Sequence, residues 1–496
     1  MEENLIAAIE LGSSAISGIV GQKFTNGEMK VLAYASIPSE SAIRHGVVYN
    51  SEKAASIIVE LIEKLKSLSG CEINMVYVTH NGKSLKSSVS EVETVFDAIK
   101  VVEDIDTDKM LQECEQQQIE GKSRLFIYPQ EFTLDNKQTK EKDPVGVSCT
   151  TLKGRYLSVV VNSKVIEDVQ RTFDRASTPV EDCFLSIVGV ADYLLDETDR
   201  QQGCALVDFG ADTTTLAIYK NGILKYLRVL PIGSSLITSD LATMLRITYS
   251  EAENLKRTYG LASLNSSQDL NETIFINSRK ITVKEIAAII EARNEEILRN
   301  LDAQIKNSGL GDLLYAGMYV IGGGSNLRQL SKAIQKSVDN IGNVHFIKEP
   351  ANSVDWVESK WMKNDGTQLS LLSILNLERE NCCTKIIFDE IDHLSPTEEG
   401  NLQQQSLFTE DGQSAQEERD RIEAAKKVAE QIQKQNEAKV TETGEEPVRE
   451  SKKSGYFKGL FSSARNLVEK LADKTENFFD EDQNTDNVQE NDDTNK

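Results

Sequence analysis

The sequence predicts an α/β protein built from two related domains, followed by a separate C-terminal region. Up to about residue 393, short apolar runs typical of buried strands alternate with helical patterns. The strand-like runs are LIAAIEL, ISGIVG, MVYVTH, YLSVVVNS, CALVDFG, TTLAIY and GMYVIGGG. One pattern occurs twice, at residues 8–14 and 206–212, where an apolar strand ends in a carboxylate, an apolar residue, glycine and small polar residues. This repeat predicts a duplicated domain with one such hairpin in each half.

Composition and charge argue against several classes of function. The chain has 496 residues, of which 39 % are hydrophobic and 27 % charged, as in ordinary globular proteins. Its 55 Lys and Arg against 79 Asp and Glu give a net charge of −24, which argues against nucleic-acid binding because that requires a basic face. Seven scattered cysteines and four histidines, without CxxC spacing, argue against a zinc site.

The sequence contains no signal for export or for crossing a membrane. The N-terminus lacks the basic flank and long apolar core of a signal peptide. There is also no run of about 18 apolar residues that could span a bilayer. We therefore expect a cytoplasmic protein with reduced thiols, so any membrane contact must come from a local basic element.

The two hairpins carry the residues that a phosphate site needs. Glu10 and Asp208 each end a strand, where a carboxylate could orient water on a metal ion. The glycine that follows lets backbone N–H groups approach a phosphate closely, and small hydroxyl residues could donate to its oxygens. A single copy would more simply be a strand ending in a turn. Two matching copies favour phosphate binding.

Two further elements could hold a nucleoside. Residues 319–327 predict a buried strand, a glycine turn and a helix, which suits a backbone platform under an adenosine. Taken alone, the glycine triplet could equally be an ordinary turn between a strand and a helix. Glu253 and Lys256 lie three apart on one face of a predicted helix and could reach a ribose and an adenine. Taken alone, they would more simply be part of a solvated, charged helix.

In this order and at these separations, the elements resemble the actin and Hsp70 ATPase superfamily. Residues 126–132 (FIYPQEF), 143–147 (DPVGV) and 232–240 narrow the resemblance to the FtsA family of bacterial cell-division proteins. Residues 253–260 and the glycine triplet are also similar, and the likeness covers about residues 5–390. It implies an actin-like fold of two related domains around a nucleotide cleft, with an FtsA-type inserted subdomain.

The resemblance also implies how the chain is divided. Domain 1 is made from three stretches, at residues 1–80, 164–202 and 358–392. The inserted subdomain, at residues 81–163, lies between the first and second of them. Domain 2 covers residues 203–357, including a small subdomain at about 241–301. The C-terminal region has three parts: an acidic disordered linker at 393–451, an amphipathic membrane-targeting helix at 452–479 and an acidic tail at 480–496.

ATP and Mg²⁺ are the cofactors that the resemblance implies. Glu10 and Asp208 would face the Mg²⁺ through water. The residues that would line the phosphates are Gly12, Ser13, Ser14, Gly210, Ala211 and Thr213. Glu253 and Lys256 would hold the ribose and the base. The residues that would back the adenosine are Gly322, Gly323, Gly324 and Ser325.

Three departures from the family pattern bear on catalysis. Ala15 stands where the family often has a phosphate-facing lysine, and Thr215 replaces the aspartate that often closes the second hairpin. Glu10 is the longer carboxylate, although glutamate is not foreign to this family. No glutamine that would position an attacking water is identified before Asp208, and no catalytic residue is assigned. Nucleotide binding is therefore the firmer expectation, with at most slow ATP hydrolysis.

The C-terminal region predicts a membrane-binding helix at the end of a linker. Residues 395–451 are rich in Glu, Gln and Ser and have too few large apolar residues to fold alone. From Gly455 to Leu471, at roughly 100° per residue, the apolar side chains share an arc of about 120°. The arc, with Lys458 and Arg465 on one border, contains Phe457, Leu460, Phe461, Ala464, Leu467, Val468 and Leu471. The alternative, a helix packed on the protein's own core, is disfavoured by the long polar linker before it.

The resemblance finally implies a role in division. FtsA-like proteins self-assemble and tether the tubulin-like protein FtsZ to the cytoplasmic membrane at the division site. On the small subdomain, Arg279, Arg293 and Glu296 match family positions implicated in FtsZ contact, although an exposed charged helix explains them equally well. Other division proteins are open as further partners.

Three alternatives stay open at this point. A type IV pilus assembly ATPase-like protein also carries an inserted subdomain, but should lack the linker and basic amphipathic helix. A sugar kinase or exopolyphosphatase-like enzyme needs a catalytic carboxylate in the cleft, and none is identified. A chaperone needs a substrate-binding β domain after the ATPase, which residues 393–451 cannot supply.

Overall fold

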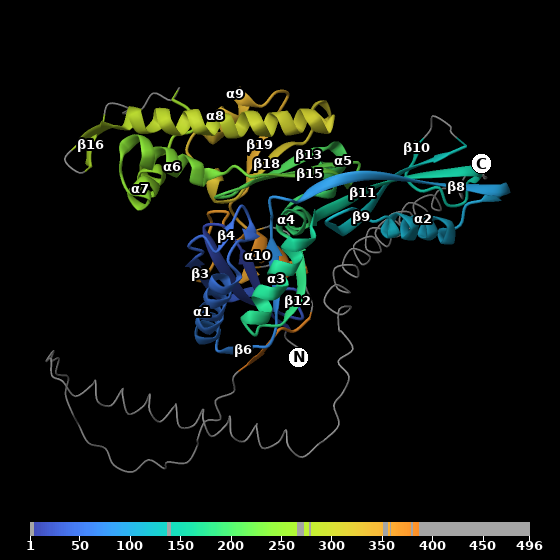
Figure 1. The fold of residues 1–496 in the computed structure, drawn as a ribbon, viewed down its shortest axis with the longest axis horizontal. Helices are drawn as coiled ribbons and strands as arrows, with labels where there is room; N and C mark the ends of the chain where they lie inside the picture. Colours follow the sequence, from blue (N-terminus) through green and yellow to red (C-terminus); the bar gives the residue numbers. More distant parts are fainter. Residues whose placement is uncertain are drawn as a thin grey trace, which may run out of the picture. The chain divides into compact units, whose positions relative to one another are not determined.

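The fold is built on two large β-sheets. The computed structural model describes residues 4–135, 140–264, 272–276, 279–350, 356–357, 359–377 and 380–385. Within them, one sheet has six strands and the other has nine (Figure 1). All seven strand-like runs predicted from the sequence are strands. The predicted linker at 393–451, helix at 452–479 and tail at 480–496 lie outside the described residues.

The first sheet combines an antiparallel meander with parallel neighbours, in the order β12-β7-β1-β2-β3-β20. Its strands are β1 (Asn4–Leu11), β2 (Ala15–Lys23), β3 (Met29–Pro38), β7 (Val76–His80), β12 (Val180–Leu185) and β20 (Trp356–Val357). The strands β1 and β7 are parallel, as are β7 and β12. Such a mixed sheet must be covered on both faces, because its strands are almost entirely buried.

Helices cover both faces of this sheet. One pair is α1 (Ser51–Ser69) with α3 (Ser163–Arg175), and the other is α4 (Ser186–Leu194) with α10 (Leu369–Leu377). On β2, Gly18 faces Leu61 and Leu65 of α1, whereas Gly21 faces Leu375 of α10. Because side chains alternate along a strand, the two helix pairs lie on opposite faces.

The second domain repeats this arrangement. A meander is formed by β13 (Cys204–Phe209), β14 (Thr214–Lys220) and β15 (Ile223–Leu230). Next to β13 lies the parallel strand β18 (Gly317–Ile321), and next to β18 lies the parallel strand β19 (Val344–Phe346). Leu11 pairs with Ile16 in the first hairpin and Phe209 with Thr214 in the second, so the two turns have the same length. The predicted duplication is therefore present. The long helix α8 (Val283–Ser308) packs on β14, β15 and α9 (Leu330–Ser337), while α5 (Glu197–Gln202) packs on β14.

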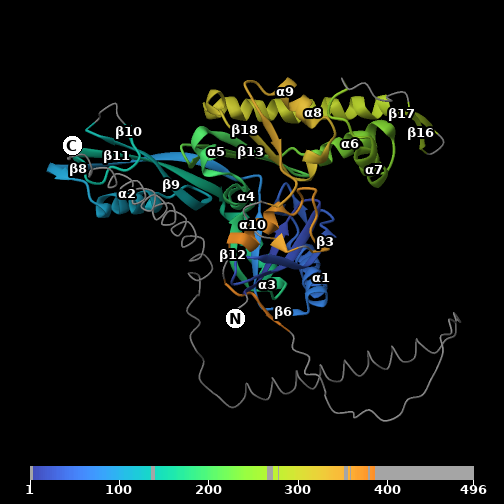
Figure 2. The same ribbon diagram turned by 180° about the vertical axis from the view of Figure 1, so that it is seen from behind.

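An insertion between β7 and α3 extends the second sheet. Its elements are β8 (Lys86–Val101), α2 (Asp104–Gln116), β9 (Lys122–Leu134), β10 (Lys140–Glu141) and β11 (Ser148–Asn162). The strand order is β10-β9-β11-β8, and Lys86 of β8 pairs with Arg228 of β15. Helix α2 covers one face of this extension, where Met110 packs with Val92 and Tyr156. Figure 2 shows α2 lying along β9 and β11 from behind.

A small subdomain precedes and includes the start of α8. It contains α6 (Ser234–Leu245), α7 (Tyr249–Tyr259), β16 (Thr273–Ile276) and β17 (Arg279–Thr282). Helices α7 and α8 both begin with a capping box, formed by Thr248 with Glu251 and by Thr282 with Glu285, which satisfies their first backbone N–H groups. The remaining elements are β4 (Ile43–Arg44), β5 (Val47–Val48), β6 (Cys71–Ile73), β21 (Cys383–Lys385) and the 3₁₀ helices η1 (Gly311–Leu313) and η2 (Gly323–Asn326). None of the helices in this described part of the chain is long and apolar enough to cross a membrane.

Candidate nucleotide site

The two predicted carboxylates lie at equivalent places in the two domains. Glu10 sits on β1 between Ser17 of β2 and Thr79 of β7. Asp208 sits on β13 between Thr215 of β14 and Ile321 of β18. Both therefore lie at the carboxyl ends of parallel strands, where α/β proteins commonly bind ligands.

The electrostatics show that the two carboxyl groups are close to each other. Burial and the nearby charge of Asp208 together raise the pKa of Glu10 to about 7, against a hydrogen bond from Ser370 that lowers it. Burial likewise raises the pKa of Asp208 to about 6, against the amide of Asn81. Among the residues that the structure describes, neither carboxyl group forms an ion pair with a basic side chain, so a hard divalent cation would stabilise the ionised form of both. This donor set fits Mg²⁺ held through water.

The turns of both hairpins are too tight for larger residues. A Cβ atom on Gly12 would lie 2.6 Å from the carbonyl oxygen of Ala15. In the second turn, the amide of Gly210 donates to the carbonyl of Thr213 at 2.9 Å. The hydroxyl of Ser13 accepts the Gly46 N–H at 2.9 Å, which leaves its own O–H able to donate to a phosphate. The chain thus brings backbone and hydroxyl groups of both turns near the carboxylates, as a phosphate site requires.

The glycine triplet packs directly behind Asp208. Gly322 has φ of 84°, and a Cβ atom there would lie 2.1 Å from Asp208 Oδ1. A Cβ atom on Gly324 would lie 2.8 Å from the carbonyl of Phe209. Ser325 is buried, and its hydroxyl donates to the Gly322 carbonyl at 2.6 Å. Ser325 therefore stabilises the turn with its side chain, so only its backbone could face a nucleoside.

The predicted ribose and base residues are paired with each other. Lys256 and Glu253 of α7 form an ion pair of 2.7 Å, and the hydroxyl of Thr238 donates to Glu253 at 2.6 Å. Burial lowers the pKa of Lys256, although the contact with Glu253 opposes this shift. Lys256 also donates to the carbonyl of Ser234, whose own amide donates to Gly210 of the second turn. The pair therefore lies beside the phosphate hairpin, with its charges mutually compensated.

Four site residues were missed by reasoning from the sequence. Asn81 donates to Asp208 at 3.3 Å, and Ser370 hydrogen-bonds Glu10. Asn81 directly follows the strand β7 and could have been found by asking which residues end the parallel neighbours of each hairpin. Ser370 lies in the apolar run of α10, where nothing local indicates a role. Asp212 and His45, which contact each other, were also missed.

The positions proposed for partner contact lie on the small subdomain. Arg293 of α8 binds Asp240 of α6 through two hydrogen bonds of 2.6 and 3.0 Å, and also binds Glu296 at 2.5 Å. Its charge is thus largely compensated within the subdomain, whereas Glu296 is 54 % exposed. The backbone of Arg279 begins β17, and its side chain lies outside what the structure describes.

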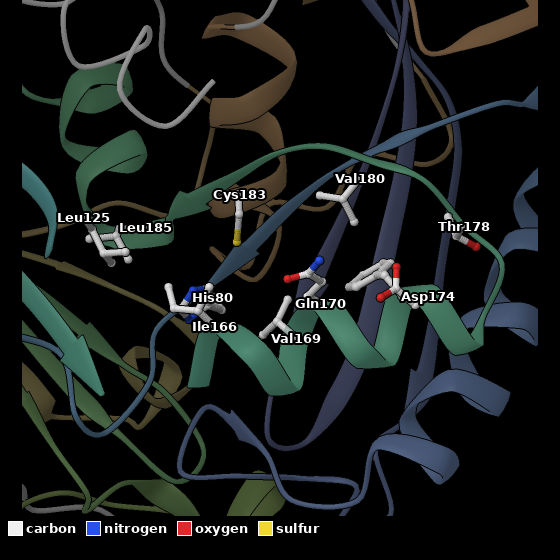
Figure 3. A pocket seen from close by; sticks show the side chains of 11 residues that line it. His80, Leu125, Ile166, Val169, Gln170, Asp174, Thr178, Val180, Cys183 and Leu185 are labelled. Atoms are coloured by element: carbon white, nitrogen blue, oxygen red, sulfur yellow. The ribbon is translucent and has the colours of Figure 1, made fainter. Parts of the chain in front are cut away.

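A separate pocket lies in domain 1 between α3 and β12. Figure 3 shows Ile166 and Val169 of α3 facing His80 and Cys183 across it. Burial lowers the pKa of His80 to about 4, so this imidazole is neutral at physiological pH. Within the described residues, its Nδ1 has no hydrogen-bond partner. We assign this pocket no role.

Family models match this chain in both the insertion and the second domain. The model for "Cell division protein FtsA" matches residues 205–360, and the model for "SHS2 domain inserted in FTSA" matches residues 82–160. The chain is 27 % identical over 331 residues to the FtsA of Pseudomonas aeruginosa, covering 65 % of this chain and 78 % of that one. It is 24 % identical over 350 residues to the FtsA of Escherichia coli K12, covering 68 % and 82 %.

Among solved structures, the chain resembles a component of the PilM-PilN type IV pilus biogenesis complex. The TM-score is 0.54 at 16 % identity, covering 75 % of this chain and 97 % of that chain. MreB 5 of Spiroplasma citri bound to AMPPNP aligns with a TM-score of 0.47 at 12 % identity, covering 76 % and 97 %. The first likeness shows the fold, which is the actin-like α/β fold predicted from the sequence, and the match over residues 82–160 shows the predicted type of insertion.

Proposed function

This chain belongs to the FtsA family of cell division proteins, and we propose that it binds Mg-ATP, assembles with further copies of itself and tethers FtsZ to the cytoplasmic face of the membrane at the division site. The observation that best supports nucleotide binding is that Glu10 of one domain and Asp208 of the other are close enough for their charges to interact. Each ends a strand beside a tight turn that offers backbone and hydroxyl groups. Glu10 and Asp208 would hold a magnesium ion through its water, and the ion would supply positive charge beside the phosphates. Because each domain contributes one carboxylate and one turn, the nucleotide would hold the two domains together.

We expect ATP hydrolysis to be slow. The side chain of Ala15 has no group that could donate to a phosphate, and Thr215 is fully buried opposite Asp208. Phosphoryl transfer depends on positioned charges and on a group that orients the attacking water. Since these two positions supply neither, the metal and the backbone would contribute most of the stabilisation of the transition state. The nucleotide would then act mainly as a structural link between domains.

The outer face of β8 supports self-assembly. Val92 packs into the core beneath α2, so the odd-numbered residues of β8 point to the other face. There Val95 is 71 % exposed and Ile99 is 77 % exposed. Beyond Lys86, this edge of β8 has no strand neighbour in the part of the chain that the structure describes. A strand with an unpaired edge and exposed apolar side chains promotes association. We propose that a second copy of the chain covers this part of β8.

Replacing Ile99 with aspartate should impair assembly without unfolding the insertion. Burying such a side chain contributes roughly 1.5–3 kcal/mol, so the contact between copies should weaken at least about tenfold. Pelleting of assemblies at increasing protein concentration, on vesicles with Mg-ATP, measures this change. Tyr315→Asp is the matched control, because Tyr315 is 70 % exposed on the second domain. Equal assembly of Ile99→Asp and wild type would place the contact between copies elsewhere.

We propose that FtsZ contacts the small subdomain, and Glu296 is the residue that best tests this contact. Arg293 is already bound to Asp240, so reversing its charge would set two carboxylates against each other and disturb the subdomain itself. Glu296 is more exposed, and replacing it leaves the bridge between Arg293 and Asp240 in place. Glu296 therefore offers the cleaner test of this surface.

Glu296→Lys should weaken FtsZ binding by between about threefold and about tenfold, the range of an exposed charge at the edge of an interface. The measurement is co-sedimentation of FtsZ with vesicles that carry the full chain. Glu295→Lys is the matched control. Glu295 is the neighbour of Glu296 on α8, and it pairs with Arg299. Identical recruitment by both variants and wild type would move the FtsZ contact off this helix face.

A further inference from the structure

Three basic side chains gather where the insertion joins the sheet of the second domain. Lys86 of β8 pairs directly with Arg228 of β15. Lys86 also lies opposite Val160 of β11, and Lys122 of β9 lies opposite Asn162, two positions further along β11. Residues directly opposite each other, like residues two apart on one strand, point to the same face of a sheet. Lys86, Lys122 and Arg228 therefore share one face, and we call them the basic cluster.

The basic cluster lacks the compensation that other cations of the insertion have. Like charges on directly opposite residues destabilise a sheet, and the Lys122 side chain, burial and the charge of Arg228 all lower the pKa of Lys86. Within the residues that the structure describes, none of the three forms an ion pair with an acidic side chain. By contrast, Lys153 of the same insertion is bound to Glu91 at 2.7 Å. An anion from outside the described residues would therefore stabilise the cluster.

The basic cluster is accessible on a face that the proposed assembly contact does not use. All three of its side chains are half-exposed. Lys86 and Val92 are an even number of positions apart on β8, so they point to the face opposite that of Val95 and Ile99. A second copy that covers Val95 and Ile99 would therefore leave the cluster free for another occupant.

The acidic tail at residues 480–496 has the complementary charge. It contains seven acidic residues and one lysine. The predicted linker at 393–451 would span roughly 40 Å as a coil, which gives the tail the reach to return to the folded domains. A carboxylate can accept parallel hydrogen bonds from a guanidinium and a further one from an ammonium group, so the tail matches the donors of the cluster.

We propose that the acidic tail at residues 480–496 binds the basic cluster of the same copy of the chain. Carboxylates of the tail would accept hydrogen bonds from the two ammonium groups and the guanidinium, which offsets the repulsion among them. Because the contact is electrostatic, it weakens as the ionic strength rises. The predicted membrane helix at 452–479 directly precedes the tail, so this contact would hold that helix near the insertion until it binds lipid.

The experiment is cross-linking of the full chain with a carbodiimide, which joins carboxylates to amines in direct contact, followed by mass spectrometry of the peptides. Wild type should give amide links from Lys86 or Lys122 to carboxylates of residues 480–493. Arg228→Gln keeps both lysines available, yet the yield of these links should fall about threefold, because one of the three charges is lost. Lys122→Gln should lower the links of Lys86 similarly, and it serves if Arg228→Gln does not fold. Lys332→Gln is the matched control and should leave the yield unchanged, since Lys332 of α9 is also exposed and forms no ion pair among the described residues.

An equal mixture of isotopically labelled and unlabelled protein shows whether the links form within one copy. The exposed pair of Lys153 and Glu91 is the internal control, because it should be linked in every sample. Links within one copy that decrease in Arg228→Gln but not in Lys332→Gln support the proposal. Absence of tail links while Lys153 is linked to Glu91 overturns it, as do links that form only between copies. The proposal also fails if anionic vesicles, and not the tail, protect Lys86 and Lys122 from acetylation, because the cluster would then bind lipid phosphate.

Discussion

Asp208→Asn should weaken Mg-ATP binding about 100-fold, equivalent to about 2.7 kcal/mol. The substitution removes one of the two charges that would neutralise Mg²⁺, and an amide is a poorer partner for the water around a hard cation. Asparagine has nearly the same volume, so the close approach of Gly322 to this side chain is kept. The loss should therefore reflect the site and not the packing. Assembly should fall with it, because the bridged nucleotide would join the domains.

Calorimetry with Mg-ATP at several pH values tests this expectation. In wild type, Mg-ATP affinity should rise from about pH 5.5 to about pH 8, because Mg²⁺ must displace protons from carboxyls whose pKa values are about 7 for Glu10 and about 6 for Asp208. In the metal-free state, the stability of the fold changes with pH in the opposite direction to the Mg-ATP affinity. The folded chain holds more protons than the unfolded chain between the ordinary and the raised pKa values, so stability is lost as pH rises through that window.

Asp208→Asn should remove part of this pH dependence. The charge of Asp208 contributes to the raised pKa of Glu10, so the remaining transition should move to lower pH. Asp302→Asn is the control, because Asp302 pairs with Lys306 on α8 outside the cleft. Unchanged Mg-ATP affinity in Asp208→Asn at all pH values would mean that the phosphate site is wrongly placed.

Phe461→Glu should abolish vesicle binding, the second large effect that we expect. Phe461 lies within the predicted apolar arc, and burial of such a side chain contributes roughly 1.5–3 kcal/mol. Glutamate loses this term and places a charge where the helix would enter the lipid. Binding of one copy should then fall at least about 100-fold, and the avidity of assemblies would magnify the loss. Nucleotide binding should be unchanged, because residues 393–451 separate the predicted helix from the two domains.

Vesicle co-sedimentation with anionic lipid measures this effect. Asn466→Glu is the matched control, since the same angular count places Asn466 on the polar side of the predicted helix. The control should keep most of its binding, with a small loss from repulsion by anionic lipid. Retention of vesicle binding by Phe461→Glu would remove the membrane tether from the proposed function.

Much of the site could be predicted because its hairpins are local structures. A strand, a carboxylate, a glycine turn and a second strand are neighbours in sequence, so Glu10 and Asp208 could be identified without knowing what surrounds them. The long strand β8 was not among the predicted strands. Its sequence alternates charged and apolar residues over an exposed face, so it lacks the continuous apolar run that marks a buried strand. Gln130 belongs to a family motif, and only the structure shows its amide donating to Leu224 of β15.

By itself, the sequence determined the α/β class, the duplicated hairpins and the family, because each depends on residues close together in the chain. Only the tertiary structure decided what surrounds those hairpins. Asn81, Ser370 and His45 reach the two hairpins from separate segments, and no local pattern indicates their partners. The structure also decided that Glu253 and Lys256 face each other and that Asp212 is already bound. Charge and hydrogen bonding depend on distances between folded segments, which a linear pattern of residues does not contain.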